Sequence, residues 1–564
     1  MSLFEDILEA RGISGEVRQR FLSPTYEDYH DPFLLPDMRA AVDRLVAAKR
    51  LGEKIVIYGD YDIDGLTATT VLLDAFESFG FVAVEAFIPN RFVEGYGLTI
   101  GAVEQIAALG AKLIVTVDCG SLSEKEIIRA GELGMEVIVT DHHNVAPVQP
   151  PAAAVINPKR LLMEYPDEYE HYILKAGSNK QGKIYPFLDL PGVGVAFKLV
   201  QALQTELDGL PKGQEKWLLD LVALGTVCDV VTLVDENRTH VFWGLKVLAK
   251  TRRQGLRALM AVAAVEPEKV NARHLGFGLG PRMNAAGRLE TAQHALDMLR
   301  AGDAEIAFQK AQQLDTLNTA RRSDQDKIYK SALLQAERYA NDPVLVVSHP
   351  DWNHGIIGIV AAKLLEKFKK PTYVLQEMGE ESKGSARSFG DFSAADAIRA
   401  ADDIITKGGG HKLAAGVTLP TQNIPLFRQR VNEFYRSQNL FNQELLLLPH
   451  EDSTLADFSG LHEELLTQLS LLEPFGNGNP EPVLKLAKAL VMNQRRMGTD
   501  AQHVKLELCD INNKTMQFLA FNAPEHFFVE PGEYVNVWFQ PLLNEWQGRR
   551  SVEGRILHME RCLP

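Results

Sequence analysis

Three aspartates at alternate positions, Asp60, Asp62 and Asp64, follow the apolar run at residues 54–58. Such a run is typical of a buried strand, and ligands of an open α/β sheet bind beyond the carboxyl ends of its strands. Carboxylates this close together repel one another unless cations share the site. The segment therefore predicts a cation site, with an exposed acidic turn as the alternative.

Further acidic and imidazole side chains follow other apolar runs of the sequence: Asp118 after residues 113–117, Asp141, His142 and His143 after 137–140, and Asp229 after the run that ends at residue 228. Each carboxylate taken singly suits a helix N-cap or a loop. Taken together, they indicate a site where several chain segments converge. Oxygen ligands with one or two imidazoles suit Mn²⁺ or Mg²⁺, with Zn²⁺ as a further option. Two such ions form the usual clamp for phosphoester cleavage, in which Asp118 is the natural bridging ligand.

The elements that would position these residues are short apolar strands alternating with helices, which predicts a doubly wound parallel α/β sheet. The expected strands are residues 54–58, 82–88, 113–117, 137–140 and 153–156, and the expected helices are residues 66–78, 98–109 and 124–133. Prolines and glycines interrupt this rhythm over residues 157–190, where we expect an insertion. Helices resume between residues 193 and 227.

The second half of the chain has two further regions. Residues 304–342 contain neither Gly nor Pro, which predicts a long helix that bridges two domains. A second α/β unit follows, with strands at 344–347 and 372–375 around a helix at 356–368. Five short strands are expected after residue 452, at 483–491, 503–509, 516–521, 534–540 and 549–557. They suit a small β-barrel such as an OB-fold.

Composition and charge narrow the class of protein. The 59 basic against 74 acidic residues leave a net charge of −15, so any nucleic acid must meet local basic surfaces rather than a global positive field. Alternatively, the acidity only aids solubility. The four cysteines form no C-x-x-C pair, which argues against a disulfide framework or a cysteine zinc site. With neither a signal peptide nor a long apolar span in the sequence, we expect a cytoplasmic protein away from membranes.

The order of these motifs resembles the DHH phosphoesterase superfamily, whose first motif is matched by residues 60–65 and whose third is matched by Asp141-His142-His143. Residues 408–416, Gly-Gly-Gly-His-Lys-Leu-Ala-Ala-Gly, resemble the signature of the associated substrate domain, DHHA1. Supporting segments lie at 280–288, 352–358, 384–388 and 474–480. Within the superfamily the chain is most similar to the single-stranded-DNA-specific exonucleases. One departure is Tyr58, where many relatives have histidine, because tyrosine is a poor Mn²⁺ ligand with an ordinary pKa of ~10.

The resemblance implies a division into an N-terminal arm at 1–45 that packs on the adjoining domain, a DHH catalytic domain at 46–300, a connecting helix at 301–342, a DHHA1 domain at 343–450 and an OB-fold at 451–564. It also implies two ions, Mn²⁺ or Mg²⁺. One would be held by Asp62, Asp118 and, in place of the missing histidine, Asp60. The other would be held by Asp64, Asp118, His142 and Asp229. His143 would contact the scissile phosphate or support the ligands, and Asp141 would orient the imidazoles.

Substrate-binding residues follow from the same resemblance: Arg282, Asn284, His354, Ser385, Arg387, Gly409, Gly410, His411 and Tyr96. The glycines would let backbone amides approach a phosphate. Arg387 would hold a terminal phosphate through its guanidinium. Tyr96 and Phe92 would stack on bases or pack in the core. Basic residues of the barrel would contact the strand or lie solvated: Lys485, Lys488, Arg495, Arg496, Lys505, Arg549 and Arg550.

The implied activity is metal-dependent hydrolysis of single-stranded DNA from its 5′ end to 5′-mononucleotides, in DNA repair and recombination. The active site would lie in a cleft between the DHH and DHHA1 domains. The implied partners are single-stranded DNA, single-strand-binding protein, a helicase and other recombination proteins, and we expect a monomer. Two alternatives stay open. One is a phosphoesterase of the same superfamily acting on short oligonucleotides or small phosphate substrates, and the other is a replication scaffold without catalysis.

Overall fold

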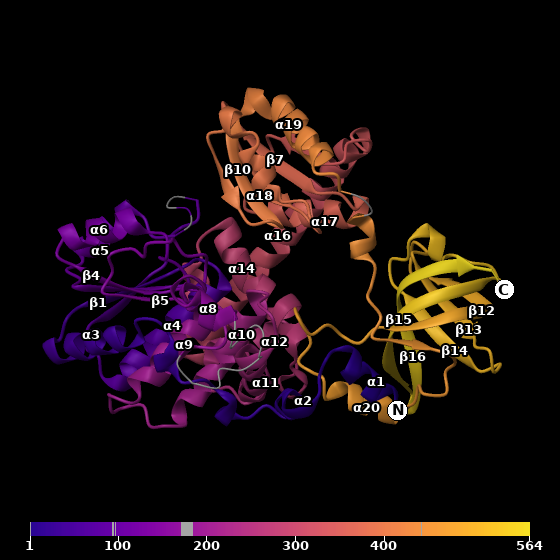
Figure 1. Ribbon diagram of the computed structural model, residues 1–564, viewed down its shortest axis with the longest axis horizontal. Helices are drawn as coiled ribbons and strands as arrows, with labels where there is room; N and C mark the ends of the chain where they lie inside the picture. Colours follow the sequence, from indigo (N-terminus) through magenta and orange to yellow (C-terminus); the bar gives the residue numbers. More distant parts are fainter. Residues whose placement is uncertain (1, 93–94, 96, 171–183, 441–442, 564) are drawn as a thin grey trace. The chain divides into compact units, whose positions relative to one another are not determined.

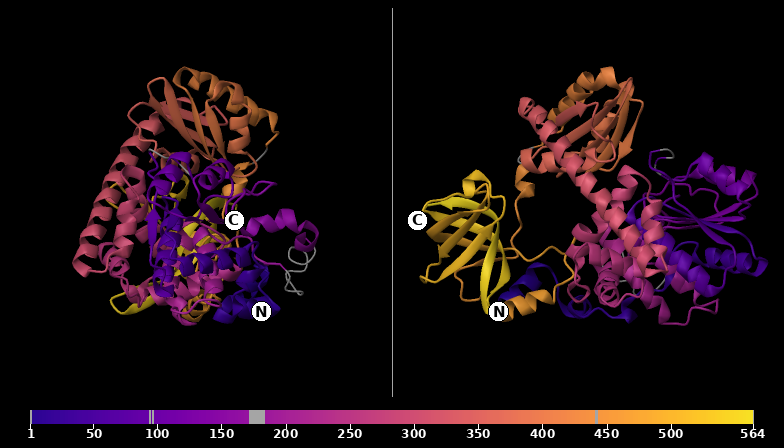
Figure 2. Two further views of the ribbon diagram at one scale, coloured as in Figure 1. Left: turned by 90° about the vertical axis from the view of Figure 1, so that its left-hand side faces the viewer. Right: turned by 180° about the vertical axis from the view of Figure 1, so that it is seen from behind.

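The computed structural model describes residues 2–92, 95, 97–170, 184–440 and 443–563. The chain forms two compact units, Met1–Asp315 together with His450–Pro564, and Thr316–Pro449. Figures 1 and 2 show their elements. Within the described part of the chain, no helix is long and apolar enough to cross a bilayer.

The first unit begins its α/β part with a parallel five-stranded sheet in the order β2-β1-β3-β4-β5. Its strands are β1 (Ile55–Gly59), β2 (Val84–Phe87), β3 (Leu113–Val117), β4 (Glu136–Thr140) and β5 (Ala154–Ile156). The helices around it are α3 (Met38–Leu51), α4 (Ile63–Phe79), α5 (Ile100–Ala108) and α6 (Glu124–Glu132). Helices α5 and α6 cover one face, and α3 and α4 cover the other (Figure 1). The predicted doubly wound parallel sheet is confirmed.

Helices complete this part of the first unit: α9 (Gly192–Leu203), α10 (Leu219–Cys228), α11 (Asp235–Leu248), α12 (Gln254–Val262), α13 (Ala272–His274), α14 (Gly280–Leu289) and α15 (Gln293–Arg300). Helix α10 packs against α4, α9 and α11 and is buried over most of its length. The insertion expected at 157–190 contains the short helices α7 (Leu161–Glu164) and α8 (Pro166–Glu168). Residues 171–183 of it lie outside the described residues.

Helix α16 runs unbroken from Ala304 to Arg338, as the lack of Gly and Pro predicts, and the boundary between the two units falls within it. The second unit has a mixed sheet in the order β6-β7-β8-β10-β9, in which only β6 and β7 are parallel. Its strands are β6 (Leu345–His349), β7 (Thr372–Met378), β8 (Glu381–Arg387), β9 (Lys407–Gly410) and β10 (Ala414–Pro420). Its other helices are α17 (Ile357–Phe368), α18 (Ala394–Arg399) and α19 (Ile424–Ser437). Strands β8 to β10 were not predicted from the sequence, because Gly, Ala, Ser and Lys have a low propensity for strands. Their conformation depends on hydrogen bonding with the neighbouring strands.

The C-terminal part of the first unit is a closed five-stranded barrel, β12-β13-β14-β16-β15, in which β15 pairs back onto β12. Its elements are β11 (Ser453–Leu455), α20 (Glu463–Ser470), β12 (Leu484–Met497), β13 (His503–Cys509), β14 (Thr515–Ala520), β15 (Tyr534–Trp546) and β16 (Arg549–Cys562). The predicted OB-like barrel is therefore confirmed (Figure 2).

The N-terminal helices are α1 (Leu3–Ala10) and α2 (Gly15–Leu22). Phe4, Ile7 and Leu8 of α1 are buried in the same core as the barrel and α20, which Figure 1 shows beside α1. Arg11 donates two hydrogen bonds to Asp452, at 2.6 and 3.0 Å. The expectation that the whole N-terminal arm packs on the adjoining domain is wrong for α1, because its apolar stripe completes a core at the other end of the chain.

Candidate metal centre and substrate-binding residues

The candidate metal centre lies at the carboxyl edge of the parallel sheet. The strand order reverses direction between β1 and β3, and ligands of such sheets bind at this switch point. Asp60 and Asp62 follow β1, and Asp118 follows β3 with a left-handed φ of 62°. Aspartate tolerates this conformation better than most residues. The sheet topology therefore brings together side chains that are more than fifty residues apart in the sequence.

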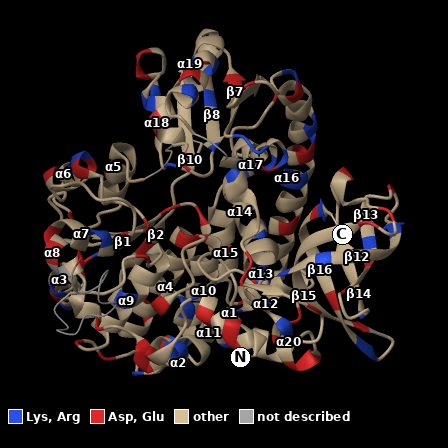
Figure 3. Cartoon of the chain, turned by 45° about the vertical axis from the view of Figure 1, so that its right-hand side comes forward, with Lys and Arg blue, Asp and Glu red and all other residues tan. Residues whose placement is uncertain are grey.

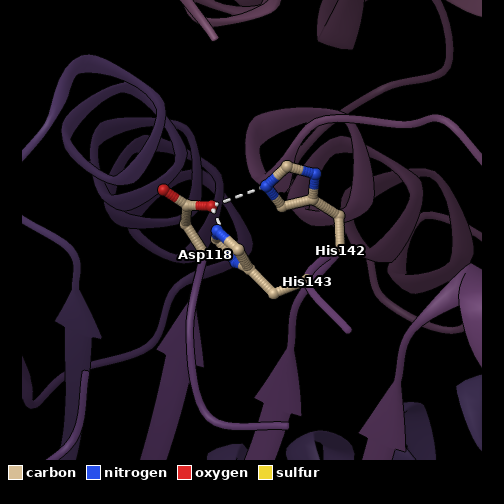
Figure 4. A group of neighbouring side chains, drawn as sticks. All are labelled: Asp118, His142 and His143. Carbon is tan, nitrogen blue, oxygen red and sulfur yellow. Dashed lines mark ion pairs between the residues drawn. The ribbon is translucent and has the colours of Figure 1, made fainter. Parts of the chain in front are cut away.

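Asp118 faces both histidines that follow β4. Its Oδ1 atom lies 3.1 Å from Nε2 of His142 and 3.8 Å from Nδ1 of His143. Figure 4 shows the carboxylate directed toward the two imidazole rings. Asp118 is 1% exposed, whereas the side chain of His143 is 31% exposed, so water and substrate can reach the cluster on the His143 side.

Two further groups of donor atoms overlap this one. Nε2 of His142 lies 3.9 Å from Oδ2 of Asp64 and 3.6 Å from Oδ2 of Asp229. On the other side, carboxylate oxygens of Asp60, Asp62 and Asp118 lie within 4.8 Å of one another. Asp229 comes from the end of helix α10 rather than from a strand. Two adjacent sets of ligands therefore meet near Asp118.

The donor atoms fit a pair of divalent cations. Within the described residues, Oδ1 of Asp60, Oδ1 of Asp118 and Nε2 of His142 are buried without a hydrogen-bond partner. Burial raises the pKa of Asp64 to about 7 and that of Asp229 to about 9, and neighbouring carboxylates add to both shifts. Burial also lowers the pKa of His142 to about 3, which leaves its imidazole neutral, as a metal ligand must be. A bound cation would supply a partner for these unpaired atoms, and its charge would reduce the repulsion between the crowded carboxylates.

Asp141 does not share in these groups but holds His143. Its Oδ1 atom lies 2.9 Å from Nδ1 of His143, and its carboxylate accepts from the backbone N–H groups of Ser121, His142 and His143. Burial opposes ionisation of Asp141, but the hydrogen bond and charge of His143 hold its pKa below the usual range. Burial likewise opposes the charged imidazolium, yet Asp141 raises the pKa of His143 above its ordinary value. The pair is therefore a carboxylate that orients an imidazole.

Backbone groups that the sequence reasoning missed hold Asp64. Its carboxylate accepts hydrogen bonds from the N–H groups of Gly192, at 2.6 Å, and Val193, at 2.8 Å, at the start of α9. A Cβ atom on Gly192 would lie 2.6 Å from Cβ of Asp118, and one on Gly225 would lie 3.1 Å from Oδ1 of Asp64. The available signal was Pro191-Gly192 at the beginning of a helix, where amides are unpaired.

Tyr58, which departs from the histidine that the family motif leads one to expect, is fully buried in the core between the sheet and α5. Its hydroxyl donates to the carbonyl of Gly97 at 2.8 Å, and its ring stacks on Phe87. The tyrosine therefore serves packing in this chain, and Asp60 is the nearby carboxylate that follows the same strand.

The predicted substrate residues of the first unit have different surroundings. The guanidinium of Arg282 on α14 donates to Asp315 and to the carbonyl of Gly278, both at 2.8 Å. Asn284 lines a cavity of about 730 Å³ together with Cys228, the neighbour of Asp229. The backbone N–H group of Phe92 donates a hydrogen bond to Oδ1 of Asn90. Tyr96 lies outside the described residues.

The remaining predicted substrate residues gather in the second unit. Ser385 and Gly409 flank Gly416 on neighbouring strands, and Ala415 pairs with Gly410. A Cβ atom on Gly358 of α17 would lie 3.2 Å from Nη2 of Arg387 and 3.6 Å from Oγ of Ser385, so these three residues lie together. His354 precedes α17 in the sequence, and His411 directly follows β9. The glycine run is an exposed edge strand rather than a loop.

Three of the basic residues predicted to meet DNA are paired with acids. Figure 3 shows where basic and acidic residues lie along the barrel strands. The ion pairs are Lys485 with Glu451, Lys505 with Glu553, and Arg550 with Glu545 and Glu463. The guanidinium of Arg496 lies over the ring of Phe528. Such pairing lowers the number of charges that can meet a phosphate without first breaking a contact.

Comparison with known proteins adds three matches to family models. The DHH family N-terminal domain matches residues 54–226, the DHHA1 domain matches 341–437, and the RecJ OB domain matches 454–558. The chain is 35% identical to the single-stranded-DNA-specific exonuclease RecJ of Bacillus subtilis, over 98% of this chain and 67% of that one. It is 33% identical to the protein of the same name from Escherichia coli, over 92% and 89% of the two chains.

Solved structures agree with this result. The crystal structure of RecJ from Thermus thermophilus in complex with Mn²⁺ matches with a TM-score of 0.81 and 29% identity, over 100% of this chain and 79% of that one. The Mg²⁺ complex of the same protein matches with a TM-score of 0.75 and 27% identity, over 100% and 78% of the two chains. Both metals expected from the donor set thus occur in these similar structures.

Proposed function

The chain belongs to the RecJ family of single-stranded-DNA-specific exonucleases, and from this we propose that it hydrolyses single-stranded DNA from the 5′ end to 5′-mononucleotides with the help of two divalent cations. It is a nuclease with DHH, DHHA1 and OB domains. The observation that carries the proposal is the pair of ligand groups that meet at the buried Asp118.

The proposed ligand sets are those that the family resemblance implies, and the overlapping groups of donor atoms around Asp118 and His142 support them. One ion would be held by Asp60, Asp62 and Asp118, and the other by Asp64, His142 and Asp229 together with Asp118, whose Oδ1 atom lies 3.1 Å from Nε2 of His142. Bound there, Mn²⁺ or Mg²⁺ ions supply an acidified water and compensate negative charge on phosphate oxygens. Asp118 belongs to both groups, so it sets the position of one relative to the other.

The chain's own groups prepare this site. Asp141 fixes the ring of His143, whose raised pKa keeps a proton available for a phosphate oxygen. The amides of Gly192 and Val193 hold Asp64 in one orientation. In the DHHA1 domain, Arg387, Ser385 and His354 bind the 5′-terminal phosphate, and the amides of Gly409 and Gly410 approach the backbone of the strand. Arginine suits a terminal phosphate because its planar guanidinium can donate twice.

The proposed setting is DNA repair and recombination in the cytoplasm. Single-strand-binding protein, a helicase and other recombination proteins are the expected partners. The protein acts as a monomer in this proposal.

The experiment compares single-stranded DNA labelled at its 5′ or 3′ end with a labelled duplex. Each is incubated with the wild-type chain or Asp118→Ala, in Mn²⁺, Mg²⁺ or EDTA. Early mononucleotide release from the 5′ label alone, abolished by EDTA and by the substitution, is the expected result. Early release from the 3′ label would refute the polarity. Faster turnover of dinucleotides than of long DNA would favour the small-substrate alternative.

A further inference from the structure

A glycine-rich loop of the C-terminal region, residues 474–480, meets the chain just after the proposed metal ligand Asp229. We call this segment the clamp loop. Gly476 and Asn479 exchange backbone hydrogen bonds of 2.9 and 3.1 Å, which leaves Asn477 and Gly478 at the tip. The buried side chain of Asn479 donates to the carbonyls of Leu472 and Pro474. The loop is therefore held in shape by its own hydrogen bonds, by the bond to Leu472 and by a hydrogen bond from Arg11 to Oδ1 of Asn479.

The tip of the clamp loop brackets the segment that follows α10. Nδ2 of Asn477 donates to the carbonyl of Val230 at 2.8 Å, and the N–H group of Leu233 donates to the carbonyl of Asn477 at 2.8 Å. A Cβ atom on Gly476 would lie 2.6 Å from Cδ1 of Leu233, so a side chain at this position would require the end of Leu233 to shift. The loop thus binds both ends of a four-residue turn.

That turn contains an unfavourable backbone conformation. Val230 has a φ of 61°, in the left-handed region, which a β-branched residue rarely adopts. Its side chain is 65% exposed, so packing around that side chain does little to hold it. Such conformations persist where the surrounding structure imposes them, and they gather at functional sites. Asn477 supplies a hydrogen bond to the carbonyl of this residue, while Asp189 and Asn237 hold Thr232 further along the turn.

Val230 is directly bonded to Asp229, whose Oδ2 atom lies 3.6 Å from Nε2 of His142. If the turn relaxed, the C-terminal end of α10 would be free to rotate the Asp229 carboxylate away from its neighbours. We propose that Asn477 is a positioning residue that keeps Asp229 in the metal centre by holding Val230 in its left-handed conformation. The barrel region thereby helps to complete the metal site of the α/β region. This inference rests on the proposed metal-dependent function.

The test measures Mn²⁺ binding to the full chain directly, by the electron paramagnetic resonance signal of free Mn²⁺, with no DNA present. Asn477→Ala is expected to weaken one of the two Mn²⁺ sites about tenfold, as loss of a group that supports a ligand commonly does. Excess Mn²⁺ should restore kcat on single-stranded DNA, with the KM for DNA unchanged. The matched control is Asn512→Ala, which removes a barrel side chain that donates to Asp457 at 2.8 Å and should leave the binding curve unchanged.

A second variant tests the route through Val230. Glycine adopts the left-handed conformation without strain, so Asn477→Ala should change Mn²⁺ affinity much less in a Val230→Gly background. An equal effect in both backgrounds would overturn the proposed route. A folded Asn477→Ala variant with wild-type Mn²⁺ binding, or with only a raised KM for DNA, would overturn the positioning role. Failure of the wild-type chain to bind Mn²⁺ or cleave DNA would instead count against the proposed function.

Discussion

The backbone N–H group of Gly192 donates a 2.6 Å hydrogen bond to Oδ2 of Asp64. The side of the same glycine where other residues carry a Cβ atom faces Asp118. One residue without a side chain thus separates and orients two carboxylates of the metal centre. Any Cβ atom there would lie 2.8 Å from Oδ1 of Asp118, closer than a van der Waals contact. The start of helix α9 is therefore part of the machinery that shapes the site.

Gly192→Ala is expected to lower DNA cleavage and Mn²⁺ affinity by about 10- to 100-fold, because either α9 or Asp118 must move. Gly194→Ala is the matched control, since the atoms nearest to its new Cβ atom would belong to Pro191 and Leu190, at 3.0 Å or more. Isothermal titration with Mn²⁺ and circular dichroism distinguish site damage from unfolding. Equal losses of Mn²⁺ affinity in the two variants would contradict the assignment.

The raised carboxyl pKa values should make the metal-free protein lose stability as the pH rises from about 7 to about 9, above the range in which the lowered pKa of His142 acts in the opposite direction. The pKa of Asp64 is raised to about 7 and that of Asp229 to about 9 in the folded chain, while unfolded carboxyls ionise near ~3.9. Between these values the folded state binds more protons than the unfolded state, so stability falls with increasing pH. Thermal unfolding in EDTA should give a lower Tm at pH 8.5 than at pH 7. Saturating Mn²⁺ should remove most of this difference, and a Tm that rises with pH in EDTA would contradict the argument.

Asp229→Asn should stabilise the metal-free protein by on the order of 2 kcal/mol at pH 8, because it removes a partly buried carboxyl group that lies beside other carboxylates. The same change should abolish most of the stabilisation that Mn²⁺ confers on the wild type. Urea unfolding with and without Mn²⁺ measures both effects. Glu433→Gln, on exposed α19, provides a carboxylate substitution far along the chain from the metal ligands, and it should change neither quantity appreciably.

Arg238→Met should destabilise the first unit by about 3 kcal/mol. The buried Arg238 guanidinium donates to the carbonyls of Phe21, Leu472 and Glu473, and thereby ties α11 to the N-terminal and barrel regions. Its removal leaves several buried acceptors unpaired. Denaturant unfolding should reveal the loss, whereas Arg252→Met, which removes an exposed guanidinium over Trp217, should cost less than about 1 kcal/mol. Comparable losses in the two would argue against a special role for Arg238.

Gln376→Ala should raise the KM for single-stranded DNA about tenfold and leave Mn²⁺ binding unchanged. Oε1 of Gln376 lies 2.9 Å from the backbone N of His354 and 2.8 Å from its Nδ1, so it holds the ring of a proposed phosphate-binding residue. Gln429→Ala, which removes an exposed amide bound to Glu433, is the control. Steady-state kinetics on DNA with and without a 5′-phosphate would check the role, and a KM equal to that of the control would refute it.

Local sequence was sufficient to predict the parallel sheet, the barrel and the long α16 helix. The strands appear in the sequence as short runs of apolar residues, and the helix appears as a long segment without Gly or Pro. It also predicted that Asp60, Asp118 and Asp141 follow strands, since a parallel sheet places the carboxyl ends of its strands along one edge. The family resemblance added the roles of these residues. These predictions need no knowledge of which distant segments touch.

Tertiary structure alone decided the contacts that join distant segments. Helix α1 packs in the barrel core. The backbone amide of Gly192 donates to Asp64, which lies 128 residues earlier in the chain. Asp229 lies at the end of a helix rather than after a strand. The clamp loop, from the C-terminal region, binds the carbonyl of Val230 through Asn477. Such contacts depend on shape, burial and backbone hydrogen bonding between elements that are formed separately. The local sequence pattern does not specify these contacts, because the same residues could pack against many different elements. Which elements touch is decided by how their side chains fit together in the folded core.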